Sequence, residues 1–132
     1  MSAARPVSPV AADVRVETRT EEGLTATARA AIGPGEPVFT GHYPDFPIFP
    51  GVCVLECVRR AATDGSAAPH PARLAAVESA RFAGAVYPGD TLSLSLTWRR
   101  TAGGLRCDAT AATERGRTAT VRLRFAYPGD TR

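Results

Sequence analysis

The sequence contains no lysine, asparagine or glutamine, and it has only three cysteines and two histidines in 132 residues. An odd cysteine number is not the pattern of a disulfide-stapled secreted domain, and we expect buried core thiols. A structural zinc site needs about four cysteine or histidine ligands at regular spacing, which these few residues do not offer. No apolar run approaches the roughly 20 residues that span a membrane, and no basic-then-apolar signal segment opens the chain. These absences predict a cytoplasmic protein with no metal and no membrane partner.

Positive charge is present only as arginine, and the sixteen arginines against thirteen acidic residues give a formal net charge of +3. The arginines are scattered, with never more than two in a row. A nucleic-acid-binding chain gathers basic residues into a patch, so we do not expect a nucleic-acid partner. Distributed arginines suit an acidic protein partner or the phosphates of a carried substrate.

Hydrophobic residues make up 44% of the chain, the composition of a globular protein, and the length suits one domain. Most of the chain alternates apolar and polar residues with a period of two, which is typical of strands with one buried face. Glycine, proline and aspartate clusters separate these segments. The alternation predicts strands at Asp13–Thr20, Leu24–Ile32, Leu74–Val86, Thr91–Thr101, Leu105–Ala111 and Ala119–Tyr127.

Residues 39–63 depart from this alternation and organise the rest of the chain. The first half reads as a loop that carries His42 and is stiffened by three prolines, Pro44, Pro47 and Pro50. The second half reads as a helix that starts near Pro50–Gly51 and stops by Gly65. This helix is apolar nearly all round, which predicts burial. Glu56 lies in its middle, and a buried carboxylate is costly unless it is paired, protonated or used.

Antiparallel strands with one polar face form a sheet that is covered on one side. About six strands and one apolar helix favour an arrangement with the helix in the concave face of a curled sheet. The expected fold class is therefore α+β, a curled antiparallel sheet of about six strands wrapped around one long buried helix. We expect residues 1–12 to be disordered or frayed, residues 13–127 to form the single domain, and residues 128–132 to form a tail.

Two separated motifs carry a resemblance to a known family. Residues 41–52 read Gly-His-Tyr-Pro-Asp-Phe-Pro-Ile-Phe-Pro-Gly-Val, and Glu56 follows His42 by 14 residues. Further along, residues 80–82 read Ala-Arg-Phe and residues 86–90 read Val-Tyr-Pro-Gly-Asp. Over residues 13–127 the sequence resembles the hot-dog fold β-hydroxyacyl-acyl carrier protein dehydratases of fatty-acid synthesis, with both motifs in the family's order.

The resemblance implies the hot-dog fold and a set of site residues. His42 would remove a proton from C2 of a 3-hydroxyacyl thioester, and Glu56 would protonate the departing C3 hydroxyl or orient water there. The backbone N–H of Gly51, at the electropositive helix N-terminus, would hold the thioester carbonyl. The loop and the substrate tunnel would be lined by Tyr43, Pro50 and Val52. Histidine titrates near neutral pH, as a base in this role must.

The resemblance also implies partners. The acyl chain would be delivered on the phosphopantetheine arm of an acyl carrier protein, and no cofactor would be needed. In this family the histidine and the glutamate of one site come from opposite subunits, so a homodimer or a heterodimer with another hot-dog subunit is expected. The pathway would be of the fatty-acid or the polyketide and polyene type.

Two arginines depart from the family pattern. The family usually has glutamine at the position of Arg60 and a small residue at the position of Arg59. Arg60 lies one helical turn after Glu56, in an orientation that favours an ion pair. A guanidinium there would keep the carboxyl group ionised and unfit as an acid. Arg60 therefore favours one alternative, a non-catalytic or half-site subunit of a heteromeric dehydratase. A second alternative is an acyl thioesterase on the same fold, which would use a carboxylate to hydrolyse the ester.

Overall fold

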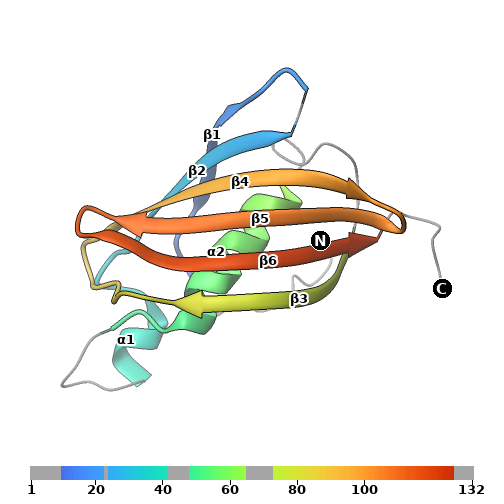
Figure 1. Ribbon diagram of the computed structural model, residues 1–132. Helices are drawn as coiled ribbons and strands as arrows, with labels where there is room; N and C mark the ends of the chain where they lie inside the picture. The colour runs from blue at the N-terminus through green and yellow to red at the C-terminus, as the bar shows by residue number, and fades with distance from the viewer. Residues whose placement is uncertain (1–9, 23, 42–47, 65–72, 127–132) are drawn as a thin grey trace, which may run out of the picture.

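A computed structural model describes residues 10–22, 24–41, 48–64 and 73–126 of the chain (Figure 1). Residues 1–9 of the predicted frayed terminus and the predicted tail, residues 128–132, lie outside these ranges. Residues 42–47, which include His42 and Tyr43, also lie outside them. The described strands are β1 (Val14–Arg19), β2 (Thr25–Ala31), β3 (Arg73–Phe82), β4 (Thr91–Thr101), β5 (Gly104–Thr113) and β6 (Gly116–Ala126). The helices are α1 (Pro37–Gly41) and α2 (Gly51–Thr63).

The strands form one six-stranded sheet in the order β1-β2-β4-β5-β6-β3, and all neighbouring strands are antiparallel. The sheet curls around α2, which crosses behind β4, β5 and β6 in Figure 1. β1 and β3 are its two edge strands. The expected architecture, one long helix in the concave face of a curled antiparallel sheet, is therefore confirmed.

The core lies between this concave face and one side of α2. Inward positions of β4 alternate strictly with exposed ones, and its side chains Leu92, Leu94, Leu96 and Trp98 are buried. Opposing them on α2 are the buried residues Cys53, Val54, Cys57, Val58, Ala61 and Ala62. The neighbouring strands β2 and β5 contribute small buried alanines, which lets the helix approach the sheet closely.

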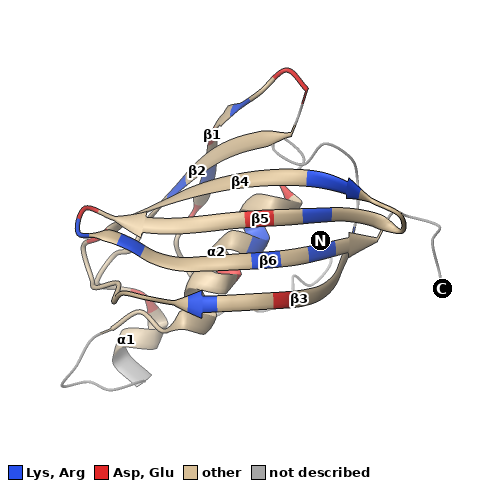
Figure 2. Cartoon of the chain, in the orientation of Figure 1, with Lys and Arg blue, Asp and Glu red and all other residues tan. Residues whose placement is uncertain are grey.

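The outward face of the sheet is charged, as the positions coloured along β3, β5 and β6 in Figure 2 show. Asp108 pairs there with Arg122 at 2.8 Å and with Arg106 at 3.3 Å, and Glu78 pairs with Arg124 at 3.2 Å. Exposed pairs of this kind contribute roughly 0–1 kcal/mol each. These charged side chains keep the outward face of the sheet polar, so a site for an apolar ligand is sought on the concave side.

The helix differs from its prediction in one respect, because it is not buried all round. Val52 is 65% exposed and Leu55 is half-buried. One sheet can cover only one side of a helix, and Val52 on the other side has no described helix or strand burying it. The predicted boundaries hold closely, since α2 begins at Gly51 and ends at Thr63.

The strand predicted at Leu74–Val86 is shorter than expected and ends at Phe82. The N–H groups of Ala83 and Gly84 both donate to the carbonyl oxygen of Thr118, at 2.8 and 3.3 Å, which turns the chain away from β6. Val86 instead bonds to Phe49 in an isolated bridge, where the Phe49 N–H donates to the Val86 oxygen at 2.7 Å. The short helix α1 lies where the sequence predicted loop.

Two adjacent glycines test how tightly β5 and β6 are packed. A Cβ added at Gly104 would overlap the backbone oxygen of Phe125, whereas a Cβ at Gly103 would meet nothing within 4 Å. We expect Gly104→Ala to lower the free energy of unfolding by about 1–3 kcal/mol or more, because the strand ladder holds that oxygen in place. Gly103→Ala is the matched control and should leave stability nearly unchanged. Urea denaturation of both variants measures the difference, and equal midpoints would contradict this packing.

Candidate active site

A groove of about 290 Å³ opens between the uncovered side of α2 and the edge strand β3. Apolar side chains make up most of its wall, and two charged residues of α2 complete it. The lining residues are Val52, Leu55, Glu56, Arg59, Leu74, Val77 and Leu123. Such a groove, apolar with a few placed polar groups, is the usual form of a site for a largely apolar ligand.

The N-terminus of α2 lies at one end of this uncovered side. Pro50 precedes the helix, and its carbonyl oxygen accepts the N–H groups of Cys53 and Val54 at 2.9 and 3.1 Å. The first N–H groups of a helix have no partner within the helix and are electropositive. A Cβ at Gly51 would come within 3.0 Å of the Phe82 ring, so the ring packs directly on the glycine. This helix end can hold an oxygen that carries partial negative charge.

The turn at residues 86–90 supports the segment that leads into α2. Its Val86 binds Phe49, and its Asp90 accepts the Tyr87 N–H at 2.7 Å. Arg115, from the turn between β5 and β6, pairs with Asp90 and lies over the Tyr87 ring. The second motif of the sequence thus fixes the backbone two residues before the helix start.

Glu56 forms a two-pronged ion pair with Arg59 at the groove wall. The Arg59 Nε donates to Oε1 at 2.7 Å and Nη2 donates to Oε2 at 2.8 Å. The Glu56 side chain is 14% exposed and that of Arg59 is 42% exposed. The hydrogen bond with Glu56 raises the pKa of Arg59 above its ordinary value. Arg60 was expected to pair with Glu56 and does so at 3.4 Å, but Arg59 lies closer to the same carboxylate, at 2.7 Å.

Arg60 has a different principal task. Its Nη1 and Nη2 donate to the backbone oxygens of Ala12 and Val10 at 2.7 and 2.6 Å, while its Nε lies 3.4 Å from Oε2 of Glu56. On the same segment the Ala11 N–H donates to the Glu36 carboxylate at 2.8 Å. Arg60 and Glu36 therefore clamp the backbone of residues 10–12 between them.

This clamp places part of the predicted frayed terminus within the packed domain. Val10 is only 2% exposed and belongs to the core cluster. Glu36 is 4% exposed, and sequence reasoning missed it because the surrounding Gly35 and Pro37 read as a surface turn. The signal that marks its role is the distant N-terminal backbone, which no local pattern reveals.

The three cysteines are buried free thiols, as expected. Burial raises the pKa of Cys57 and of Cys107 to about 12. Burial is also the main reason that the pKa of Cys53 is raised. A nucleophilic or metal-binding cysteine needs an accessible thiolate, so these thiols serve packing.

The predicted site residues of α2 lie along one stretch of the structure. Pro50, Gly51 and Val52 form the helix start, and Glu56 lies in the groove wall one turn further on. His42 and Tyr43 lie outside the described residues, so their predicted roles stay predictions. Among the described residues, neither helix has the length and hydropathy needed to cross a membrane.

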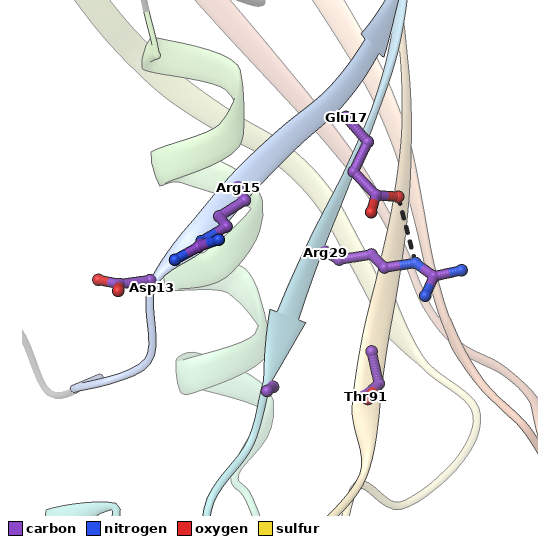
Figure 3. A pocket seen from close by; sticks show the side chains of 6 residues that line it. Asp13, Arg15, Glu17, Arg29 and Thr91 are labelled. Carbon is purple, nitrogen blue, oxygen red and sulfur yellow. Dashed lines mark ion pairs between the residues drawn. The ribbon is translucent and has the colours of Figure 1, made fainter.

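A second hollow, of about 400 Å³, lies over β1 and β2 and is seen in Figure 3. Charged side chains form most of its wall, and Arg29 pairs there with Glu17 at 3.2 Å. Its charged residues alternate with the inward-facing ones along both strands. This hollow lacks the apolar wall that an acyl chain needs, so the groove beside α2 is the better candidate.

Comparison with known proteins gives the family of this chain. A family model described as the ApeI-like ApeI dehydratase matches residues 17–121. The 3-hydroxyacyl-[acyl-carrier-protein] dehydratase FabZ of Thermus thermophilus is 42% identical over 96 residues, which cover 65% of this chain and 67% of that protein. The FabZ protein of Actinobacillus pleuropneumoniae matches over 60% of its own length.

Solved structures confirm the hot-dog fold. The dehydratase heterocomplex ApeI:P from Xenorhabdus doucetiae matches with a TM-score of 0.69 at 19% identity, covering 86% of this chain and 98% of that one. The PaaI protein of the phenylacetic acid degradation operon of E. coli matches with a TM-score of 0.70 at 16% identity, covering 88% of this chain and 80% of that one. With a family model spanning most of its domain and a sequence relative above 40% identity, the chain belongs to the ApeI-like dehydratases, as a divergent member of the hot-dog dehydratase family.

Proposed function

We propose that this chain dehydrates a 3-hydroxyacyl thioester carried on acyl carrier protein and releases the trans-2-enoyl thioester. The observation that carries the proposal is Glu56 in the wall of an apolar groove, one turn from the N-terminus of α2. The relatives named as 3-hydroxyacyl-[acyl-carrier-protein] dehydratases support it. The acyl chain would belong to fatty-acid or polyketide and polyene biosynthesis.

The elimination breaks a C–H bond at C2 and the C–O bond at C3, forms the double bond between them, and releases water. His42 is the base that takes the C2 proton, because an imidazole accepts a proton near neutral pH. Charge then builds on the thioester oxygen, which the N–H of Gly51 would stabilise at the helix end. One such donor is typically worth about 2.7–4 kcal/mol at the transition state. Glu56 acts at the C3 hydroxyl.

The groove suits the acyl chain of such a substrate. Its apolar lining comes from α2, β3 and β6, and the charged groups lie on α2 alone. An acyl chain placed along the helix would keep its apolar carbons against Leu55, Leu74 and Leu123 and bring C3 to Glu56. Burial of each methylene there is worth roughly 0.8 kcal/mol.

A second hot-dog subunit would complete this site. β3 is an edge strand of ten residues, and edge strands left uncovered are prone to pair with another chain. Large apolar side chains are exposed here: on β3 itself, Phe82 is 50% and Val77 is 44% exposed, and on α2, Val52 is 65% exposed. Exposed apolar patches of this kind mark interaction sites. The partner would be a second copy or a related subunit, and the structural neighbour named as the dehydratase heterocomplex ApeI:P supports this proposal.

One observation favours a second candidate, a half-site subunit that works only beside a different chain. Arg59 occupies both oxygens of Glu56, and a carboxylate held in that way is a poor proton donor. In that case the partner subunit would supply the acid and this chain would contribute the groove.

A single-turnover assay on 3-hydroxyacyl-carrier protein tests the proposal, with mass spectrometry following loss of one water. Wild type should lose water, and His42→Ala should be slower by about 10²–10⁴-fold because the base is gone. Glu56→Gln should also be impaired. Glu17→Gln, which alters an exposed ion pair on the far strand β1, is the matched control and should behave as wild type. Loss of water by wild type and by both site variants alike would contradict the assignment. If wild type turns over only after another hot-dog chain is added, the half-site reading is correct.

The edge of β3 can be tested separately. Val77→Asp places a charge in the exposed apolar patch and should convert a dimer into a monomer in sedimentation experiments, because burying an unpaired carboxylate is costly. Leu24→Asp is the control, since Leu24 is 37% exposed near the other edge of the sheet. A dimer that survives Val77→Asp but not Leu24→Asp would place the interface at β1 and β2 instead.

A further inference from the structure

Arg59 and Arg60 both reach Glu56, yet the structure gives them unequal roles. The two terminal nitrogens of Arg60 donate to the backbone oxygens of Val10 and Ala12, and only its Nε approaches the carboxylate, at 3.4 Å. The fork of Arg59 is directed at Glu56, with one nitrogen on each oxygen at 2.7 and 2.8 Å. Removing Arg59 therefore takes away the closer of the two guanidinium groups that pair with Glu56 and leaves the 3.4 Å contact with Arg60.

Besides Glu56 and Arg59, the described residues that line the groove are apolar. Among the groove-lining residues that the structure describes, β3 contributes Leu74 and Val77, and β6 contributes Leu123. On α2 itself the neighbouring thiols Cys53 and Cys57 also feel the negative charges of Glu56 and Glu36. Among the described residues, the charged groups around this carboxylate and the thiols beside it include Arg59 and Arg60 of its own helix and the buried acid Glu36.

We propose that Arg59 is a positioning residue that keeps Glu56 ionised, so that Glu56 orients the departing C3 hydroxyl by accepting its hydrogen bond and does not give it a proton. A carboxylate bound by both prongs of a guanidinium has its oxygens fixed in one plane and is favoured in the charged form. This inference rests on the proposed dehydration and specifies how its second residue works.

The elimination needs no proton from Glu56, because His42 can both remove the C2 proton and deliver it to the leaving oxygen. The imidazole of His42 takes the proton from C2, and the electron pair of that C–H bond forms the double bond as the C3–O bond breaks. The imidazolium then gives the same proton to the leaving oxygen, which departs as water. His42 returns to its neutral form, and Glu56 stays a carboxylate throughout, holding the hydroxyl in line for this transfer.

The test is the pH profile of kcat/KM for wild type and Arg59→Gln, in whatever assembly proves active. Glutamine keeps much of the length of the side chain and removes its charge. If Glu56 must be ionised, loss of the guanidinium makes it protonate at higher pH, and the acidic limb should move up. A shift of about one pH unit is expected, the lower end for an opposite charge at this distance because Arg59 is 42% exposed. Activity well below the limb should then fall about tenfold.

Two variants serve as controls. Arg59→Lys restores the charge without the fork and should return part of the shift. Arg122→Gln breaks an exposed pair with Asp108 on the outward face of the sheet and should leave the profile unchanged. A rise in activity with the alkaline limb displaced upward would overturn the proposal, since that is the signature of an acid freed from its counter-charge. An unchanged profile in Arg59→Gln would overturn it as well.

A second readout does not need turnover and separates this inference from the proposed function. Carbon-13 NMR of protein labelled at the glutamate carboxyl carbons follows the protonation of Glu56 directly, with Glu56→Gln used to assign its signal. The titration midpoint of that signal should lie higher in Arg59→Gln than in wild type. Equal midpoints would overturn the inference even if the protein proves to be an active dehydratase.

Discussion

The site of this protein follows from one geometric constraint: a single curled sheet can cover only one side of α2. The covered side is fully buried, with Cys57 and Val58 at 0% exposure, while Val52 on the other side is 65% exposed. Apolar surface left in water costs roughly 25 cal/mol per Å² relative to burial, so this open side favours whatever covers it. The groove beside β3 and the exposed apolar side chains around it both arise from this incomplete coverage.

Charge is placed at the boundary that this constraint creates. Glu56 lies where α2 passes from its buried side to its open side, which explains why its side chain is 14% exposed and still reaches Arg59. Arg60, the residue after Arg59, binds the N-terminal segment instead. Together with Glu36 it holds the backbone of residues 10–12. Adjacent arginines on one helix thus contact different parts of the structure, Arg59 the carboxylate in the groove wall and Arg60 the N-terminal backbone.

The strands and the start of α2 could be predicted from local pattern, because the alternation in β4 and the proline-to-glycine helix start depend on neighbouring residues only. The closer contact of Glu56 with Arg59 than with Arg60 could not be predicted in this way. Positions three and four residues along a helix are equally within reach, and the choice is made by Val10 and Ala12, whose backbone oxygens lie 50 and 48 residues from Arg60. The end of β3 at Phe82 likewise depends on the Thr118 carbonyl, on another strand. The helix was expected to be buried all round because its residues are apolar on nearly every side, whereas the described sheet covers only one side of it.

The central claim, that a second chain completes the site over α2, is tested most directly with mixed dimers of His42→Ala and Glu56→Gln purified through two different tags. If each site takes its histidine from one chain and its glutamate from the other, a mixed dimer has one intact site and one doubly altered site. We then expect about half of wild-type dehydration activity per mixed dimer, because one of its two sites is intact, although each variant alone is nearly inactive. A mixed dimer as inactive as its parents would show that both groups act within one chain, and it would contradict the account.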